Sequence, residues 1–397
     1  MSFTQLQTLT ARLNQLDAQG LRRIRHEVES VCQPHLLVDG QALLAFNSND
    51  YLGLAAHPLV VEALREGASL YGAGSGASHL ISGHSQAHER LEELLGMMLS
   101  PFLPSVRVLS FSTGYMANLG VLSAMADMAK GDITFFSDQL NHASLIDGVR
   151  LTREPCQVYA HADVADLSLK FSSCQSGTKV VVTDGVFSMD GDIAPLKELL
   201  ALCEHHGAWL LVDDAHGFGV LGETGAGVLQ HFNLRSEQLI YMGTLGKAAG
   251  VSGAFVAAHE DVIEWMVQRS RPYIYTTASS PALAHALLTS VRIIRGEEGR
   301  RRRAHLQTLI QQLSTAPIPS NWQRMISTTA IQPLVIGSNQ AVLQASADLK
   351  AQGIWISAIR APTVPVNTAR LRITLSASHT AQDVDRLVRA LSFESIS

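Results

Sequence analysis

The stretch Tyr241-Met-Gly-Thr-Leu-Gly-Lys-Ala-Ala-Gly-Val-Ser-Gly-Ala254 places one lysine, Lys247, inside a run of small residues. The apolar segment Leu239-Ile-Tyr-Met242 leads into it and predicts a buried strand. Glycines on both sides of the lysine let the backbone turn sharply and approach a ligand closely. Thr244 and Ser252 add hydroxyl groups able to bind a phosphate. The setting favours a lysine positioned for chemistry, whereas Gly-Lys alone indicates an ordinary solvated lysine.

A second stretch suggests what this lysine binds. Ala208-Trp-Leu-Leu-Val212 predicts a buried strand, and it runs directly into Asp213-Asp-Ala-His-Gly217. A carboxylate at the C-terminal end of a parallel strand lies where α/β sheets place their ligands. Pyridoxal 5′-phosphate (PLP) needs a lysine for its aldehyde and a carboxylate that keeps its pyridine nitrogen protonated. We therefore predict PLP as the cofactor, with Lys247 as Schiff-base former and Asp213 beside the ring nitrogen.

His216 belongs to the same constellation, where it is placed to reach the phenolic oxygen or the imine of the cofactor. The alternative for Asp-Asp-Ala-His is a helix N-cap with a nearby charge. The lysine stretch downstream makes the PLP interpretation the stronger one.

Strands and helices alternate through the middle of the chain, a pattern typical of a mostly parallel α/β sheet. Seven strands are predicted, a number that suits one large domain. They are Val106–Phe111, Ile133–Phe136, Gln157–Tyr159, Lys179–Thr183, Ala208–Asp213, Leu239–Met242 and Gly253–Ala257.

The chain has 397 residues, enough for two or three domains at the usual size of about 100–200 residues. We expect an N-terminal helical and short-strand segment over 1–57, a large α/β domain over 58–290 and a smaller α+β domain over 291–397. The first segment has leucines at helical spacing, interrupted near Asp17. The last has strand-like runs at 330–336, 354–359 and 371–375, with helical segments near 340–351 and 381–392.

Composition excludes several classes of function. Hydrophobic residues make up 46% of the chain and charged residues 16%, with a net charge of −5, so neither nucleic acid nor membrane binding is expected. The four cysteines lack paired spacing, which predicts neither disulfides nor a metal site and fits a reducing cytoplasm. Neither a secretory signal nor an apolar run of about 18 residues is visible.

Nine motifs occur in the order found in the α-oxoamine synthases, and the chain resembles that family over roughly residues 20–393. These are fold-type I PLP enzymes that condense an amino acid with an acyl thioester and release carbon dioxide. The motifs are Asn49-Asp-Tyr-Leu-Gly-Leu54, Gly74-Ser-Gly76, Ser112-Thr-Gly-Tyr115, Asn141-His-Ala-Ser144, Asp184-Gly-Val-Phe-Ser-Met-Asp-Gly191, Asp213-Asp-Ala-His-Gly217, Gly243-Thr-Leu-Gly-Lys247, Ala358-Ile-Arg-Ala-Pro-Thr-Val-Pro365 and Ala369-Arg-Leu-Arg-Ile-Thr-Leu375.

The resemblance implies a large domain with a seven-stranded sheet, a smaller α+β domain, a homodimer and further cofactor contacts. His142 would stack on the pyridine ring and act in catalysis with Lys247, Asp213 and His216. Ser188 would join His216 at the phenolic oxygen. The phosphate would be held by Gly114, Tyr115 and Thr244, with Thr276 and Thr277 supplied by the neighbouring subunit. A helix start such as the one at Gly114 offers backbone N–H groups to an anion.

Substrate contacts are implied in the same way. Arg360 would bind the amino-acid carboxylate, since an arginine fork pairs with a carboxylate bidentately. Thr363, Arg22 and Asn47 would contact substrate, as would His142. The C-terminal motifs are most similar to the branch that joins L-alanine to a pimeloyl thioester, carried by coenzyme A or acyl carrier protein.

Three alternatives stay open at this point. The nearest is another branch of the same family: 2-amino-3-ketobutyrate ligase, 5-aminolevulinate synthase or serine palmitoyltransferase. A non-catalytic subunit of a PLP complex would normally lack the lysine that is present here. A nucleotide-binding protein using Gly72–Gly76 is disfavoured, because the segment before that loop reads as helix rather than strand. One departure from the family is the small Ala249 after the lysine, where many relatives carry a bulky residue.

Overall fold

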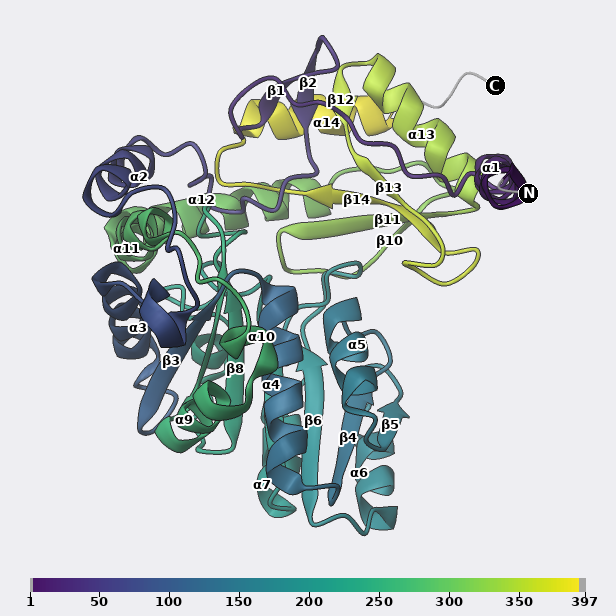
Figure 1. Cartoon of the computed structure of the whole chain (residues 1–397). Coiled ribbons are helices and arrows are strands. Elements are labelled where there is room, and N and C mark those ends of the chain that lie inside the picture. The colour runs from purple at the N-terminus through teal and green to yellow at the C-terminus, as the bar shows by residue number, and fades with distance from the viewer. Residues whose placement is uncertain (1–2, 393–397) are drawn as a thin grey trace. The chain divides into compact units, whose positions relative to one another are not determined.

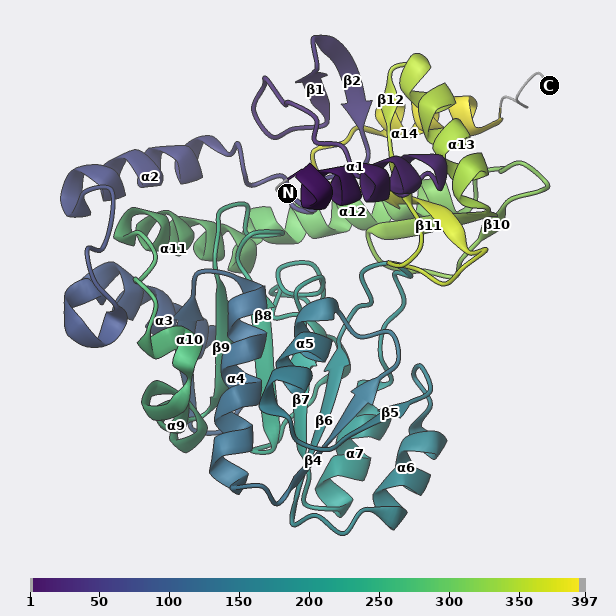
Figure 2. The same ribbon diagram turned by 45° about the vertical axis from the view of Figure 1, so that its right-hand side comes forward.

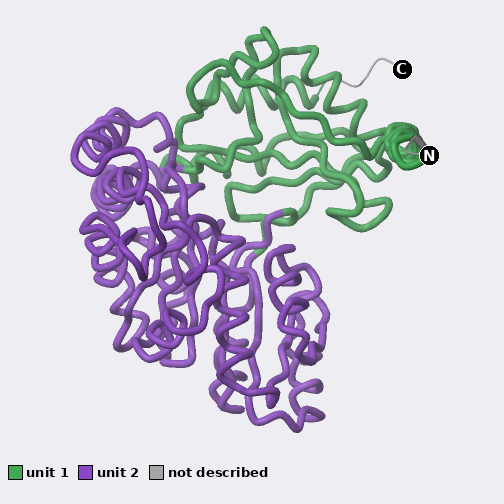
Figure 3. The backbone as a smooth tube through the Cα atoms, in the orientation of Figure 1, with its two compact units in different colours: residues 1–51, 189–192, 305–397 green, residues 52–188, 193–304 purple. Residues whose placement is uncertain are grey.

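The computed structural model describes residues 3–392, and it divides the chain into two compact units (Figure 3). Unit 1 contains residues 1–51, 189–192 and 305–397; unit 2 contains 52–188 and 193–304. The boundaries expected from the sequence, at 57/58 and 290/291, remain a prediction of domain organisation. The last boundary between the units falls within helix α12 (Glu297–Ser314).

Unit 2 is built on a seven-stranded sheet in the order β3-β9-β8-β7-β6-β4-β5 (Figure 1). All pairs are parallel except those made by β9, which runs antiparallel to both β3 and β8. The predicted mostly parallel sheet is confirmed. The strands are β3 (Val106–Phe111), β4 (Ile133–Asp138), β5 (Cys156–Tyr159), β6 (Thr178–Asp184), β7 (Trp209–Asp213), β8 (Leu239–Thr244) and β9 (Ala254–His259).

Helices fill the connections between these strands, and α4 packs on α5, α9 and the strands β8 and β9, while α7 packs on β7 (Figure 2). The helices of unit 2 are α2 (Pro58–Tyr71), α3 (Gln86–Leu99), α4 (Gly114–Ala129), α5 (Ala143–Thr152), α6 (Val164–Ser173), α7 (Leu196–His205), α8 (Val228–Phe232), α9 (Glu260–Arg269), α10 (Arg271–Ile274) and α11 (Pro281–Arg295), with a π-helical turn η1 (His79–Gly83).

The central strands form because they are continuous apolar runs, the pattern of strands buried on both faces. All six residues of β8 are buried, and so are the last five of β6. At the carboxyl ends of these strands lie the polar side chains of Asp184, Asp213 and Thr244. That edge is where α/β sheets bind ligands.

Unit 1 contains two small sheets. One has the order β1-β2-β12, and the other has the order β10-β11-β14-β13 with antiparallel pairing throughout. Its strands are β1 (His35–Val38), β2 (Gln41–Ala45), β10 (Gln323–Arg324), β11 (Ile331–Gly337), β12 (Ile354–Trp355), β13 (Ser357–Ile359) and β14 (Ala369–Thr374), and its helices are α1 (Phe3–Ala18), α13 (Asn339–Ala351) and α14 (Ala381–Ser392).

Some details differ from the sequence-based expectation. Pro281 predicts the start of one long helix that includes Arg300–Arg303. Instead α11 ends at Arg295 and α12 begins separately at Glu297, because the intervening Gly296 adopts an extended backbone. The run expected as one strand over 354–359 is two short strands in different sheets. Over the described part of the chain, no helix is both long and apolar enough to cross a membrane.

Candidate active site

The carboxyl ends of β6 and β7 bring two acidic side chains together. The two strands pair in parallel with Asp184 opposite Asp213, and both residues are buried. Burial raises the pKa of Asp184 well above its ordinary value, and the nearby charge of Asp213 adds to the rise. Asp184 Oδ2 accepts a hydrogen bond of 2.6 Å from the backbone N–H of His142, so it anchors the start of α5.

Asp213 is held in a fixed orientation by two donors. Its Oδ2 accepts from the Asn118 side-chain amide at 2.7 Å, and its Oδ1 accepts from the backbone N–H of Ala215 at 3.0 Å. A carboxylate has about four lone-pair positions, so acceptor capacity is left for one more N–H. This is the arrangement that a protonated pyridine nitrogen requires.

Lys247 follows β8 and lies beside His216, which follows β7. The Lys247 Nζ and His216 Nε2 atoms are 2.8 Å apart. Because a charged ammonium has donors only, His216 accepts from it through an unprotonated Nε2. The turn after the lysine closes with a 2.8 Å bond from the Gly250 N–H to the Lys247 carbonyl. The lysine and histidine predicted to act together are thus neighbours.

His142 caps the N-terminus of α5 with its ring on the surface of the chain. Its Nδ1 lies 2.7 Å from Ser144 Oγ, which also accepts from the Asn118 amide at 2.8 Å. Surrounding protein atoms desolvate the ring and lower its pKa, against the opposing charge of Asp213. A chain of hydrogen bonds thus joins Asp213 through Asn118 and Ser144 to His142.

The predicted phosphate-binding positions meet at the start of α4. Thr113 caps this helix by accepting from the Met116 N–H at 3.2 Å, so the first N–H groups, from Gly114 onward, point out of the helix end. A Cβ built on Gly114 would lie 4.0 Å from Thr244 Oγ1, which places β8 directly beside this helix start. The exposed Tyr115 side chain donates its hydroxyl to Asp147.

The remaining cofactor candidates lie on loops of the same unit. Ser188 is half-buried in the turn after β6. Thr276 is half-buried and Thr277 is exposed in the segment after α10, where Thr277 forms an antiparallel bridge with Ser78. The predicted contact of Thr276 and Thr277 with the cofactor phosphate of a neighbouring subunit stays a prediction.

Of the four substrate-binding residues predicted in unit 1, two line one cavity and two do not. Arg360 donates to the Gly20 carbonyl and, with Thr363, lines a cavity of about 310 Å³. Burial lowers the pKa of Arg360, and so does the charge of Arg23, which lines the same cavity. Arg22 is instead ion-paired with Asp17 at 2.6 Å and is absent from this lining.

Asn47, the other substrate candidate of unit 1, lies half-buried just after β2. Asn47 is not among the residues that line the 310 Å³ cavity. Its predicted substrate contact therefore stays a prediction.

Sequence reasoning assigned no role to Asn118, Asp184, Ser144 or Arg23. Asp184 and Ser144 lie within motifs that carried the family resemblance, and Asn118 lies three residues after another. Their signal was a polar residue at a buried position, and Asn118 is fully buried on an otherwise apolar helix. Such a residue is expected to have a specific partner.

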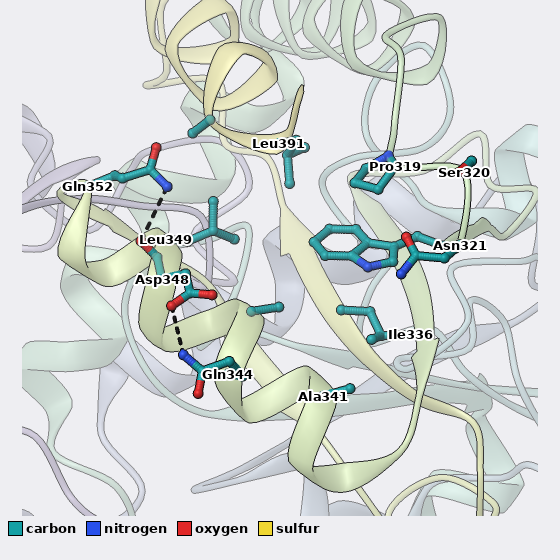
Figure 4. A pocket seen from close by; sticks show the side chains of 13 residues that line it. Pro319, Ser320, Asn321, Ile336, Ala341, Gln344, Asp348, Leu349, Gln352 and Leu391 are labelled. Atoms are coloured by element: carbon teal, nitrogen blue, oxygen red, sulfur yellow. Dashed lines mark hydrogen bonds between the residues drawn. The ribbon is translucent and has the colours of Figure 1, made fainter. Parts of the chain in front are cut away.

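A larger cavity, of about 790 Å³, lies elsewhere in unit 1. Figure 4 shows Pro319 and Asn321 on one side of it, and Asp348 of α13 with Gln352 just after that helix on the other. None of the predicted site residues lines this cavity.

Comparison with known proteins gives the class first. The family description "Aminotransferase class I and II" matches residues 41–391, and the chain belongs to that family. It is a fold-type I PLP-dependent transferase. A solved structure of serine palmitoyltransferase with PLP superimposes with a TM-score of 0.87 at 27% identity, over 98% of this chain and 96% of that one.

Curated relatives then narrow the class. A protein of Janthinobacterium sp. (strain Marseille) is 62% identical over 96% of each chain, and one of Bordetella petrii is 61% identical over 98% of this chain and 97% of its own. Both are called 8-amino-7-oxononanoate synthase.

The residues present fit PLP. Asp213 keeps acceptor capacity for a ring N–H, Lys247 offers an amine, and the start of α4 offers backbone N–H groups beside Thr244. A glycine at the helix start leaves space where a side chain would otherwise approach Met242 and Thr244. The cofactor predicted from the lysine and the carboxylate is confirmed.

Proposed function

We propose that this chain condenses L-alanine with a pimeloyl thioester, releasing carbon dioxide and a free thiol, to give 8-amino-7-oxononanoate for biotin biosynthesis. The observation that carries the proposal is the near full-length likeness to relatives of that name, at 56–62% identity. The arrangement of Lys247, His216 and Asp213 supports a chain able to perform the chemistry.

PLP, when bound, supplies an electron sink that makes the α-carbon of the amino acid acidic. Asp213 would face the ring nitrogen, held in place by Asn118 and the Ala215 N–H. Lys247 would take the α-proton at Nζ and return one to the product carbon after decarboxylation. His216 Nε2 lies 2.8 Å from that Nζ. His216 would orient the amine and accept a hydrogen bond from it whenever the amine is protonated.

Other residues would position the reactants. His142 would lie over one face of the ring, fixed by its bonds to Ser144 and Asp184. Ser188 would support the phenolic oxygen with His216. Gly114, Tyr115 and Thr244 would bind the phosphate, where the helix start favours an anion.

Arg360 would pair with the amino-acid carboxylate, and Thr363 beside it would contact the same substrate. Arg22 and Asn47 would read the far carboxyl group of the donor or its ester. The structure suggests Arg23 as a further candidate for that contact, because it lines the cavity with Arg360.

We further propose that the protein works in the cytoplasm as a homodimer, with acyl carrier protein or coenzyme A carrying the pimeloyl group. Thr276 and Thr277 would then serve the phosphate of the partner subunit.

The substrate assignment is tested by competition. Equal alanine, glycine and serine are offered together with pimeloyl, acetyl, succinyl and palmitoyl thioesters, each on coenzyme A and on carrier protein. Mass spectrometry of the products should show the alanine–pimeloyl adduct as the main species. The Lys247→Ala protein is the matched control and should form none of it. Preference for glycine with acetyl would instead assign the chain to the ketobutyrate ligase branch.

One methyl group in a pocket is worth only about 1–3 kcal/mol, so alanine and glycine should differ by about 10–200-fold rather than absolutely. The comparison therefore needs all amino acids in one vessel, where small differences in kcat/KM decide the product ratio.

A further inference from the structure

Three histidines of unit 2 gather outside the PLP site. His79 begins the π-turn η1, His84 follows it and His88 lies in the first turn of α3. One ring nitrogen from each lies within 4.8 Å of the other two. None of these side chains has a part in the chemistry proposed above.

The local fold forces two of these rings to face each other. Gly83 closes η1 by donating its N–H to the Ser78 carbonyl at 2.9 Å. A Cβ at Gly83 would lie 2.1 Å from the Ala77 carbonyl oxygen, so only glycine fits this turn. The turn leaves His79 Nδ1 and His84 Nδ1 only 2.9 Å apart. Single π-turns are rare and are often found at functional sites.

The Nε2 atoms of His84 and His88 already have hydrogen-bond partners. His84 Nε2 lies 3.0 Å from Glu89 Oε2, and His88 Nε2 lies 3.0 Å from the Ser279 carbonyl. Metal-binding histidines typically donate their second nitrogen to a carboxylate or a carbonyl in this way. The anchoring turns Nδ1 of His84 toward His79. His88 Nδ1 accepts from the Ser85 N–H at 3.1 Å, a bond that a metal ion would replace.

We propose that His79, His84 and His88 form a binding site for a divalent transition-metal ion of the Zn²⁺ type. Nitrogens bound to tetrahedral zinc at 2.0–2.1 Å are about 3.3 Å apart, so the two Nδ1 atoms need to separate by only a few tenths of an ångström. His88 has to approach from within 4.8 Å by a side-chain adjustment. Imidazole ligands select zinc, nickel and copper over magnesium and calcium.

An ion here would stabilise a segment that the PLP site uses. The loop before η1 is bonded to residues 277–279 through the bridge between Ser78 and Thr277 and a 2.9 Å bond from the Ala278 N–H to the Ala77 carbonyl. Fixing the three rings would therefore hold Thr276 and Thr277 in one arrangement. Metal binding should raise the melting temperature of the holoenzyme, because the ion binds the folded state only.

The test uses chelator-treated holoenzyme titrated with Zn²⁺ and, separately, Mg²⁺ in a calorimeter. One Zn²⁺ per chain and no Mg²⁺ binding are expected. His79→Asn and His84→Asn should each lower Zn²⁺ affinity at least about tenfold, and Glu89→Gln should lower it about 10–100-fold through the anchored His84 ring. His231→Asn, on the exposed surface of α8, is the matched control and should bind Zn²⁺ as the unmodified protein does.

Copper provides an independent count of the ligands. The electron paramagnetic resonance spectrum of the Cu²⁺ form should show coupling to three imidazole nitrogens, reduced to two in either histidine variant. Circular dichroism before metal addition establishes that each variant is folded. Absence of Zn²⁺ binding overturns the proposal, and so does unchanged affinity in both histidine variants.

Discussion

Two neighbouring carboxylates, Asp213 and Asp214, have opposite surroundings. Asp213 lies at the ligand edge of the sheet, with amide donors on both oxygens. Asp214 is completely enclosed, and its Oδ2 accepts from the Tyr241 hydroxyl at 2.7 Å and the Val228 N–H at 2.8 Å. Asp213 is thus placed to act on a ligand, and Asp214 is placed to join β7 to β8 and α8.

Asp213→Asn should keep the fold and lose turnover. Asparagine has nearly the same shape, but a neutral amide cannot hold a proton on the pyridine nitrogen. We expect kcat to fall on the order of a hundredfold or more, equivalent to about 2.7 kcal/mol of barrier. The value of kcat is measured by varying one substrate while the other is saturating, and PLP content is determined by absorbance. Asp214→Asn is the matched control, and equal losses in both variants would contradict a special role for Asp213.

Asp214 should make stability depend on pH. Burial raises its pKa from 3.8 to about 7, so between pH 4 and 7 the folded chain keeps a proton that the unfolded chain has released. The free energy of unfolding therefore falls as pH rises through this window and levels off above it. The loss of unfolding free energy over this window amounts to about 4 kcal/mol.

Asp214→Asn cannot titrate, so the difference in unfolding free energy between the two proteins isolates this group. We expect the original chain to lose stability relative to the variant from pH 5 to 7, measured by urea unfolding. A difference that stays constant across that range would show that Asp214 keeps an ordinary pKa when folded.

From the sequence we could propose residues for the chemistry, but not the residues that hold them in place. Lys247 follows one apolar strand and Asp213 ends another, and that position predicts the ligand-binding edge of a sheet. Asn118 could not be assigned, because its partner depends on how α4 lies against β7 and not on any local pattern. Arg23 was passed over for Arg22, since adjacent residues in an irregular segment carry no periodicity that tells which one faces a cavity.

At the scale of elements, the turn that carries Lys247 depends on one glycine. Gly250 has a φ of +69°, and a Cβ there would lie 2.4 Å from the Ala55 N and 2.5 Å from the Leu54 carbonyl carbon. Both atoms belong to the backbone, so they cannot move aside cheaply. The turn can therefore close against residues 54–55 only when position 250 has no side chain.

Gly250→Ala should destabilise unit 2 and displace Lys247. Strain at positive φ alone costs about 1 kcal/mol or more, and the backbone clash adds to it. We expect a melting temperature several degrees lower and weaker PLP binding. Gly246→Ala is the matched control, because a Cβ there meets nothing closer than 3.9 Å. Equal melting temperatures for the two variants would show that the turn relaxes without cost.

Elements were predictable where one pattern dominated. The strands of the large sheet are long apolar runs, and all seven were expected. Short elements were not, because β10 has two residues and β1 is half exposed, which leaves little periodicity. The π-turn η1 depends on the Gly83 contact with Ala77, a feature of folded geometry that composition does not encode.

The proposed homodimer is a prediction at the scale of the whole molecule. In it, each active site takes Lys247 from one subunit and Thr276 and Thr277 from the other. Residues 277–279 are tied to the Gly72–Gly76 region of the same chain through a 2.6 Å bond from Ser75 Oγ to the Ala278 carbonyl. The family resemblance implies that the Gly72–Gly76 loop, like the Thr276–Thr277 segment, lies at the subunit interface. Within unit 2 the two segments form one structure.

Mixing two inactive variants tests this arrangement. One carries Lys247→Ala, and the other carries Thr276→Ala with Thr277→Ala. If the threonines bind the phosphate in the partner's active site, a mixed dimer has one site with both defects and one site with none. Random exchange makes about half of the dimers mixed, so activity should return to about a quarter of the unmodified level at limiting PLP. If the threonines serve their own chain, every site keeps a defect and mixing restores nothing. Each variant alone, taken through the same exchange, supplies the baseline.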